Sequence, residues 1–156
     1  MATIVVGTDG SPSARQAIDW ALGEARLRGA EVRLVHAWML PLIDAIPEPW
    51  AIGLPPLAPG DEGRVHEKIE GAARALLENA VKEAREQEPS LSIEGELVEA
   101  RAAHALLQSA RGADLLVVGS RGGGGFAGLH LGSVSSQCVH HAECPVVVVP
   151  APGKDG

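Results

Sequence analysis

Short runs of valine, leucine and isoleucine alternate along the chain with segments whose apolar residues are spaced three and four positions apart. The runs have the length and β-branched content of buried strands, whereas the spaced segments have the period of amphipathic helices. Residues 91–98 alternate apolar and polar positions, which predicts a half-exposed strand near a sheet edge. Strands separated by helices in this way predict an α/β protein with a parallel sheet. The predicted strands are 3–7, 32–38, 91–98, 115–119 and 145–149.

The first predicted helix has the clearest boundaries. Ser11 is a favourable N-cap residue, Pro12 suits the first helical position, and Gly29 follows the last turn. A second helix is predicted over 62–87, and shorter ones over 101–111 and 133–142. The apolar stripe of the first helix is Ala14, Ala17, Ile18, Ala21, Leu22 and Ala25. That of the second is Val65, Ile69, Ala72, Ala73, Leu76, Ala80 and Ala84.

One segment, residues 39–60, interrupts the alternation of predicted strands and helices. It holds six of the eleven prolines and is long for a connection inside a compact domain. It also carries many large apolar residues, which a purely solvated linker does not need. It therefore fits a lid over the sheet end, a contact with another subunit, or a stiff cover over the second helix. We expect one domain over residues 1–150 and a frayed tail over 151–156.

Composition narrows the possible functions. The 156 residues suit one ordinary domain, and the net charge of -7 disfavours binding to nucleic acids or anionic membranes, which need a basic face. Aromatic residues make up only 3%, too few for a base-stacking platform. No apolar stretch is long enough to span a membrane, and the first residues do not resemble a signal peptide. We therefore expect a cytoplasmic protein.

The most informative segment is residues 117–137, in which a predicted strand ends at Gly119, a glycine-rich loop follows, and a helix begins near Ser133. Glycines allow backbone N–H groups to approach a phosphate closely, and a helix start offers unpaired donors with a partial positive charge. No Asp or Glu occurs between Asp114 and Glu143, and the same stretch contains Arg121. This pattern favours an anion site, the alternative being a surface loop that is merely rich in glycine.

Three common nucleotide and hydrolase motifs do not fit the loop. Gly123-x-Gly125-x-x-Gly128 matches the dinucleotide pattern literally, but the helix begins too late and residue 148, where an acidic residue is expected, is valine. No lysine stands in a Walker A pattern, and no GxSxG elbow is present. The loop therefore calls for a different nucleotide motif.

The spacing Gly119-x2-Gly122-x9-Gly132-Ser133 resembles the ATP-binding motif of the universal stress protein family. The opening IVVGTDGSPSA resembles the first strand and turn of that family, and SVSSQCVHHAECPVVVVP resembles its last helix and strand. The resemblance covers residues 3–150. One departure is Ala100-Arg101, where many members carry a glycine, and it affects a turn rather than the nucleotide site.

The resemblance implies a Rossmann-like fold of the adenine nucleotide alpha hydrolase type. Its open five-stranded parallel sheet has the order 3-2-1-4-5, with helices on both faces. Ligands of such sheets bind beyond the carboxyl ends of the strands where the order reverses. Here those ends are Gly7-Thr8-Asp9 and Gly119-Ser120-Arg121.

The resemblance also implies roles for individual residues in binding ATP. Asp9 would accept hydrogen bonds from the ribose hydroxyls, and backbone groups of Ala37 would bind the adenine edge. Gly119 and Gly122 would let the chain pass close to the ribose and phosphates, and Arg121 could add positive charge. The phosphate donors would lie at the last helix start, in Gly132, Ser133, Val134 and Ser135.

The function implied is that of an ATP-binding stress-response regulator, with magnesium held through the phosphates and hydrolysis slow at most. We assign no catalytic residue, because the glycine loop holds no general base and no second carboxylate accompanies Asp9. Two alternatives remain: an ATP-dependent hydrolase or transferase with its catalytic residues in 39–60, and an interaction module that binds no nucleotide.

Other cysteine and histidine residues are also candidates for chemistry. The cysteines and histidines near the C-terminus do not have paired zinc-ligand spacing, so no metal site is expected there. His36 lies in an apolar strand and is interpreted as a hydrogen-bonded core histidine. The residues weighed for zinc are Cys138, His140, His141 and Cys144.

The valines of residues 146–149 form the last strand, which lies at a sheet edge in the order 3-2-1-4-5. An unprotected apolar edge promotes association, and pairing with the same strand of a second copy would cover it. A homodimer is also what the family resemblance implies. The alternative is that the C-terminal tail or the segment 39–60 covers this edge.

Overall fold

The computed structural model describes residues 1–40, 60–120 and 132–151. Arg121 and Gly122, nearly all of the proline-rich segment 39–60, and most of the tail 151–156 lie outside these residues. Predictions made for them stay predictions. Within the described ranges, none of the helices combines the length and the hydropathy that crossing a bilayer requires.

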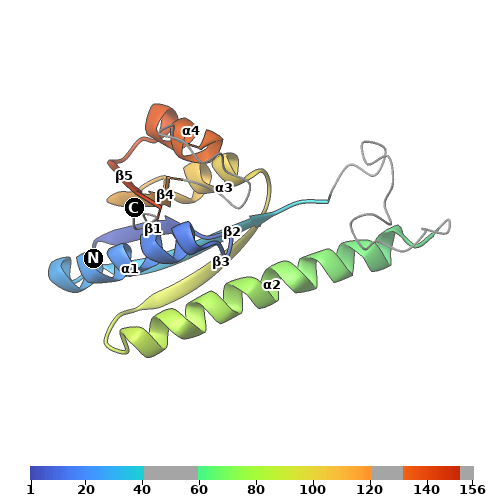
Figure 1. The fold of residues 1–156 in the computed structure, drawn as a ribbon, viewed down its shortest axis with the longest axis horizontal. Coiled ribbons are helices and arrows are strands. Elements are labelled where there is room, and N and C mark those ends of the chain that lie inside the picture. Colours follow the sequence, from blue (N-terminus) through green and yellow to red (C-terminus); the bar gives the residue numbers. More distant parts are fainter. Residues whose placement is uncertain (41–59, 121–131, 152–156) are drawn as a thin grey trace, which may run out of the picture.

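The described chain forms one five-stranded sheet in which every neighbouring pair is parallel (Figure 1). The strand order is β3-β2-β1-β4-β5, so the predicted fold is confirmed. β1 is central and pairs with both β2 and β4, which places Val6 opposite Leu34 on one side and opposite Val117 on the other. The strands are β1 Thr3–Gly7, β2 Glu31–Trp38, β3 Ile93–Glu99, β4 Leu115–Gly119 and β5 Val146–Val149.

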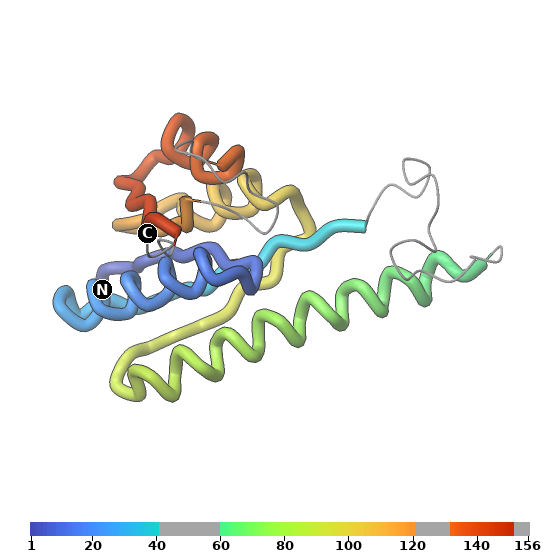
Figure 2. The backbone as a smooth tube through the Cα atoms, in the orientation of Figure 1, coloured from blue at the N-terminus to red at the C-terminus, as the bar shows by residue number. Residues whose placement is uncertain are grey.

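Helices cover both faces of this sheet, as predicted (Figure 2). α1 and α2 pack on the face that contains Ile4, Val6 and Leu34. The opposite face contains Val5 and Val118 and packs against Leu106 of α3 and Cys138 of α4. Coverage of both faces explains why the central strands are continuous apolar runs rather than alternating ones. The helices are α1 Pro12–Arg28, α2 Glu62–Gln87, α3 Ala102–Ser109 and α4 Ser133–His141.

α1 has the boundaries that its sequence predicts. The Ser11 side chain accepts a hydrogen bond from the Ala14 N–H at 3.2 Å, and Pro12 occupies the first helical position. Gly29 ends the helix in the left-handed conformation at φ 64°, where a residue without a Cβ avoids steric strain. All six residues of the predicted stripe are buried, so the local signals and the packing agree.

The predicted buried stripe of α2 is wrong in its middle part. Leu77 and Val81 are buried instead of Leu76 and Ala80, which are half-buried, while Ala72 is exposed. The cause lies in β3, because a Cβ on Gly95 would stand 2.9 Å from Val81 and 3.2 Å from Leu77. The glycine lets α2 approach the edge strand closely, and this contact fixes the rotation of the helix.

Candidate functional site

The carboxyl ends of β1 and β4 lie side by side at the centre of the sheet, where the strand order reverses. From β1 the chain continues outward to β2 and β3 on one side, and β4 and β5 fill the other side. In open α/β sheets such a reversal leaves a crevice in which ligands bind. Gly7, Thr8 and Asp9 are at one of these ends, and Gly119 and Ser120 at the other.

The turn after β1 is held by short-range hydrogen bonds that position Asp9. The Thr8 hydroxyl accepts from the Gly10 N–H at 3.2 Å, and Asp9 Oδ1 accepts from the Ser11 N–H at 2.9 Å. Gly10 has φ 78°, a conformation that favours glycine. Thr8 is buried, whereas Asp9 is exposed, so the turn displays the carboxylate at the carboxyl end of β1.

Ala37 presents its backbone to the same region. Val35 accepts the Thr8 N–H at 2.9 Å, so the peptide groups of Val35 point toward β1. Peptide groups alternate in direction along a strand, and those of Ala37 therefore point the same way as those of Val35. β1 ends at Gly7, opposite Val35. The N–H and carbonyl of Ala37 thus point to the space beyond the end of β1.

The end of β4 is occupied mainly by contacts within the fold. The Ser120 N–H donates to Val149, its carbonyl accepts from the Gly132 N–H, and its hydroxyl accepts from the Ala151 N–H at 3.0 Å. A Cβ on Gly119 would stand 2.5 Å from the Ser13 hydroxyl. Gly119 is therefore needed to let the start of α1 pack against β4, whatever it contributes to a ligand.

The start of α4 is different, because its donors are not used by the helix. Gly132 is the N-cap residue and has no side chain with which to cap. The first helical bond is from the Ser136 N–H to the Gly132 carbonyl at 2.9 Å, so the N–H groups of Ser133, Val134 and Ser135 have no partner in α4. The bond from Gly132 to Ser120 holds this start beside the end of β4.

Ser135 can offer only its backbone. The residue is 1% exposed, and its hydroxyl donates to the Gly132 carbonyl at 3.0 Å. Ser133 is exposed and Val134 is half-buried. The described part of α4 contains no acidic residue. Peptide donors, the helix dipole and a helix without acidic residues together make this start suited to an anion such as phosphate.

His36 was interpreted from the sequence as a core histidine with a hydrogen bond, and the structure gives its partner. Nδ1 lies 2.7 Å from the Thr8 carbonyl oxygen, and the side chain is half-buried. A carbonyl only accepts hydrogen bonds, so Nδ1 carries the proton. No local pattern indicates that this residue contacts the turn of Asp9, because the contact joins positions 28 residues apart.

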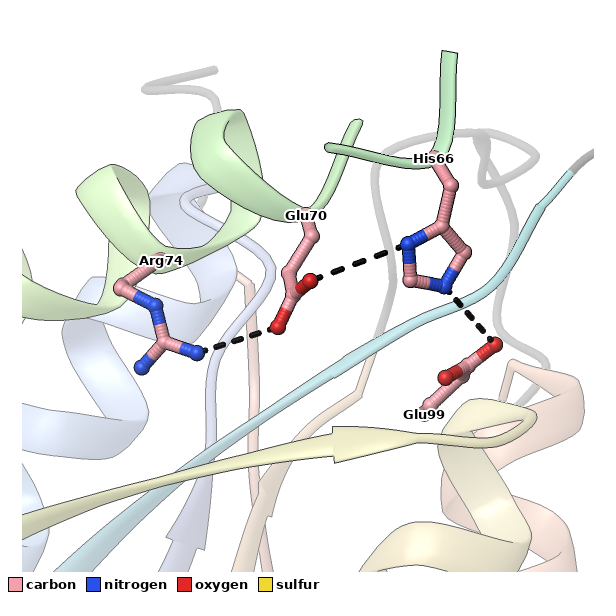
Figure 3. Close-up of polar contacts among 4 residues, drawn as sticks. All are labelled: His66, Glu70, Arg74 and Glu99. Atoms are coloured by element: carbon pink, nitrogen blue, oxygen red, sulfur yellow. Dashed lines mark hydrogen bonds and ion pairs between the residues drawn. The ribbon is translucent and has the colours of Figure 1, made fainter. Parts of the chain in front are cut away.

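A second polar group near the ends of β2 and β3 was not predicted (Figure 3). His66 Nδ1 lies 3.8 Å from a Glu70 oxygen, and its Nε2 lies 3.7 Å from a Glu99 oxygen. Arg74 pairs with the other Glu70 oxygen at 3.2 Å, and the His66 ring packs edge-on against Trp38. These side chains are partly exposed, so their polar contacts contribute little to holding α2 against β3. Both nitrogens of the His66 ring already face carboxylates.

The residues weighed for zinc do not converge. Among the described residues, no group of three or more His, Cys, Asp or Glu side chains is arranged to hold a metal ion. Burial, with a smaller contribution from nearby Cys144, raises the pKa of the Cys138 thiol to about 11. Cys138 therefore stays protonated at neutral pH and acts as a small apolar residue between α4 and the sheet.

The chain is similar to universal stress proteins in both sequence and structure. A sequence model of the Universal stress protein family matches residues 1–150. A universal stress protein of Mycolicibacterium smegmatis is 37% identical over 147 residues, which cover 94% of this chain and 45% of that protein. A universal stress protein of Mycobacterium tuberculosis is 36% identical over 149 residues, 94% of this chain and 46% of the relative. The chain thus spans about half the length of these curated relatives.

Solved structures share the fold over nearly the full length. A universal stress protein described as a complex with cAMP has a TM-score of 0.65 and is 27% identical, with 97% of this chain and 98% of that chain covered. The protein MJ0577 has a TM-score of 0.76 at 22% identity, with 98% of both chains covered. At that identity the second likeness concerns the fold alone.

Proposed function

Because the chain belongs to the universal stress protein family, we propose that it is a nucleotide-dependent stress-response regulator that binds ATP beyond the ends of β1 and β4. The observation that carries this proposal is the start of α4, where the N-cap glycine has no side chain to cap the helix and the bond from Gly132 to Ser120 holds the helix beside the end of β4. A relative 27% identical to this chain was solved with cAMP, which supports an adenine nucleotide as the ligand class.

The β- and γ-phosphates bind at the start of α4. The N–H groups of Ser133, Val134 and Ser135 donate to phosphate oxygens, and the helix dipole favours the negative charge. Gly132 has φ -61° and ψ 162°, values that any residue can adopt. Glycine is thus not needed there for its backbone conformation, which is consistent with a need for space beside a ligand. Arg121 and Gly122 belong to the proposed site by their place in the motif.

The nucleoside binds between the turn of Asp9 and the end of β2. The exposed Asp9 carboxylate accepts hydrogen bonds from the ribose hydroxyls, and the peptide groups of Ala37 bind the adenine edge. Magnesium, when present, is held through the phosphates. Thr8 and Gly10, on either side of Asp9 in the turn, offer no second carboxylate to organise the metal for rapid phosphoryl transfer, so we expect hydrolysis to be slow.

The nucleotide content of freshly purified protein tests the proposal, with acid release and chromatography to identify what is bound. We expect an adenine nucleotide, or binding of added Mg-ATP in calorimetry if none is retained. Protein that neither retains nor binds any adenine nucleotide contradicts the proposal and favours an interaction module. Rapid turnover of saturating Mg-ATP contradicts the regulator and favours an ATP-dependent hydrolase or transferase.

We also propose that β5 mediates homodimer formation. β5 is an edge strand that pairs with β4 alone within the described sheet. Val146, Val147 and Val148 are half-buried within one chain, so pairing with a second β5 about a two-fold axis would bury them further. Val147→Lys and Val148→Lys probe the two sides of the strand. We expect a dimer in sedimentation that at least one lysine disrupts. A monomeric wild type, or a dimer that survives both substitutions, contradicts the proposal.

A further inference from the structure

Thr8 is the residue through which β2 holds the turn that carries Asp9. The Thr8 N–H donates to the Val35 carbonyl at 2.9 Å, and its carbonyl accepts from His36 Nδ1 at 2.7 Å. Two consecutive residues of β2 therefore bind the two backbone groups of one residue. The first of these bonds continues the regular pairing of the sheet, whereas the second comes from a side chain.

The bond from His36 has a specific consequence for Asp9. The Thr8 carbonyl belongs to the same planar peptide unit as the Asp9 N–H, so holding this oxygen fixes the orientation of that unit. The Asp9 carboxylate is fixed further along, where Oδ1 accepts from the Ser11 N–H at 2.9 Å. Gly10, which lies between Asp9 and Ser11, has φ 78° and lacks the restraint of a side chain. Without His36 the turn keeps its later bonds but loses the one that orients its first peptide.

We propose that His36 is a positioning residue that sets the preference of the site for ribose over deoxyribose. It acts through the Thr8 carbonyl on the Asp9 carboxylate and does not itself touch the nucleotide. This inference rests on the proposed function, in which Asp9 accepts hydrogen bonds from the ribose hydroxyls. A hydrogen bond that a protein holds in place favours the ligand more than one whose acceptor must first be ordered.

A positioning role differs measurably from a packing role. The side chain of His36 is only half-buried, and its bond to the Thr8 carbonyl is only partly buried. Loss of the histidine donor is therefore expected to loosen Asp9 more than it destabilises the fold. A histidine that only packs would give the opposite result, with a lower melting temperature and an unchanged ratio of ribose to deoxyribose affinity.

Two near-isosteric substitutions of His36 distinguish the contribution of Nδ1 from that of Nε2. In His36→Asn the amide nitrogen stands at the position of Nδ1, which makes the observed contact, whereas in His36→Gln it stands near the position of Nε2. The affinities for ATP and dATP are measured by calorimetry for the full chain, together with the melting temperature. We expect the ATP affinity of His36→Gln to fall about tenfold while that for dATP changes by less than about twofold, the size of effect of one hydrogen bond. His36→Asn is expected to retain the ratio of the wild type.

Each other outcome has a distinct meaning. If His36→Gln keeps the ribose preference, or His36→Asn loses it as fully, the inference is wrong while the proposed site stands. Equal binding of ATP and dATP by the wild type overturns the inference together with the role of Asp9, but leaves the phosphate site intact. A wild type that binds neither nucleotide overturns the proposed function. In the Asp9→Ala background, a further effect of His36→Gln on the ratio would also contradict the inference, because the two residues then act separately.

Discussion

α1 and α4 begin at the same edge of the sheet, and their N-cap residues have almost the same backbone conformation. Ser11 has φ -72° and ψ 161°, and Gly132 has φ -61° and ψ 162°. At α1 the Ser11 hydroxyl accepts the Ala14 N–H, and Pro12 has no N–H to satisfy. At α4 the cap has no side chain, and three successive N–H groups have no partner in the helix.

The difference shows that a helix start is not in itself an anion site. Both starts have the favourable dipole, but at α1 the cap hydroxyl accepts the Ala14 N–H, Pro12 has no N–H, and an acidic residue, Asp9, stands in the turn before the helix. α4 keeps its donors and lies in a stretch without carboxylates, from residue 115 to residue 142. Under the proposed function the two helices therefore have different roles: α1 anchors the fold, and α4 is expected to bind the phosphates.

The largest expected effect comes from filling the space beside the donors of α4. Gly132→Val should weaken ATP binding by about a hundredfold or more, because several hydrogen bonds to charged oxygens are lost together. The fold should be kept, since the backbone angles of Gly132 suit other residues. Calorimetry and circular dichroism measure both properties. Unchanged ATP affinity in the folded variant contradicts the assignment of α4 as the phosphate site.

A smaller effect is expected at the turn that leads to α1. Asp9→Ala should weaken ATP binding by about 1–3 kcal/mol, the usual cost of losing hydrogen bonds to a charged group. Binding of dATP should weaken less, because one ribose hydroxyl is already absent. Titration of both nucleotides against the wild type and the variant tests this, with Asp19→Ala on the exposed side of α1 as a matched control. Equal losses for ATP and dATP would argue against contact with the ribose.

The two helices also differ in the side chains that anchor them to the sheet. α1 is anchored mostly by alanines, and α4 by Ser135 and Cys138. Burial raises the Cys138 pKa from 9.0 to about 11, so the folded state keeps a proton that the unfolded state releases first. The protonated thiol therefore contributes fully to the free energy of unfolding below pH 9.0. This contribution is lost as the pH rises toward about 11, which lowers the free energy of unfolding by about 2 kcal/mol. Denaturant unfolding of the wild type and Cys138→Ala across this range measures it. Parallel pH profiles would show that the thiol is not the cause.

The smallest effect is expected from removal of the cap of α1. Ser11→Ala should lower the free energy of unfolding by about 1 kcal/mol, because the Ala14 N–H loses its acceptor. ATP affinity should change by less than about twofold, since the Ser11 N–H that binds Asp9 is retained. Urea unfolding and calorimetry give the two values. A large loss of affinity with no loss of stability would reverse the roles assigned to the two helices.

Local signals in the sequence predicted the parts of the fold that local physics decides. α1 begins after Ser11, with Pro12 at its first position, and ends at Gly29, as expected. The apolar runs form the central strands. The rotation of α2 could not be predicted from its own residues, because it depends on the missing side chain of Gly95 in another element. Periodicity identifies a helix but does not say which neighbour it meets.

The candidate site was predictable to a similar extent. The glycine spacing correctly indicated a helix that begins at Ser133, and the topology brings this start to the end of β4. The contacts of His36 with Thr8 and of His66 with Glu99 were not predictable, because each joins positions far apart in sequence. Nor did the glycine pattern reveal that Gly119 is needed for packing against Ser13.

The most direct test transfers the cap of α1 to α4. The double substitution Gly132→Ser, Ser133→Pro reproduces the pair Ser11-Pro12 on a backbone of nearly the same conformation. Its ATP affinity and melting temperature are compared with those of Ser133→Ala, which keeps the N–H. We predict a protein at least as stable as the wild type whose ATP affinity falls by about tenfold or more, because α4 then uses or lacks the donors that phosphate needs. A folded double variant that binds ATP as tightly as Ser133→Ala would contradict the claim that the peptide donors at the start of α4 hold the nucleotide.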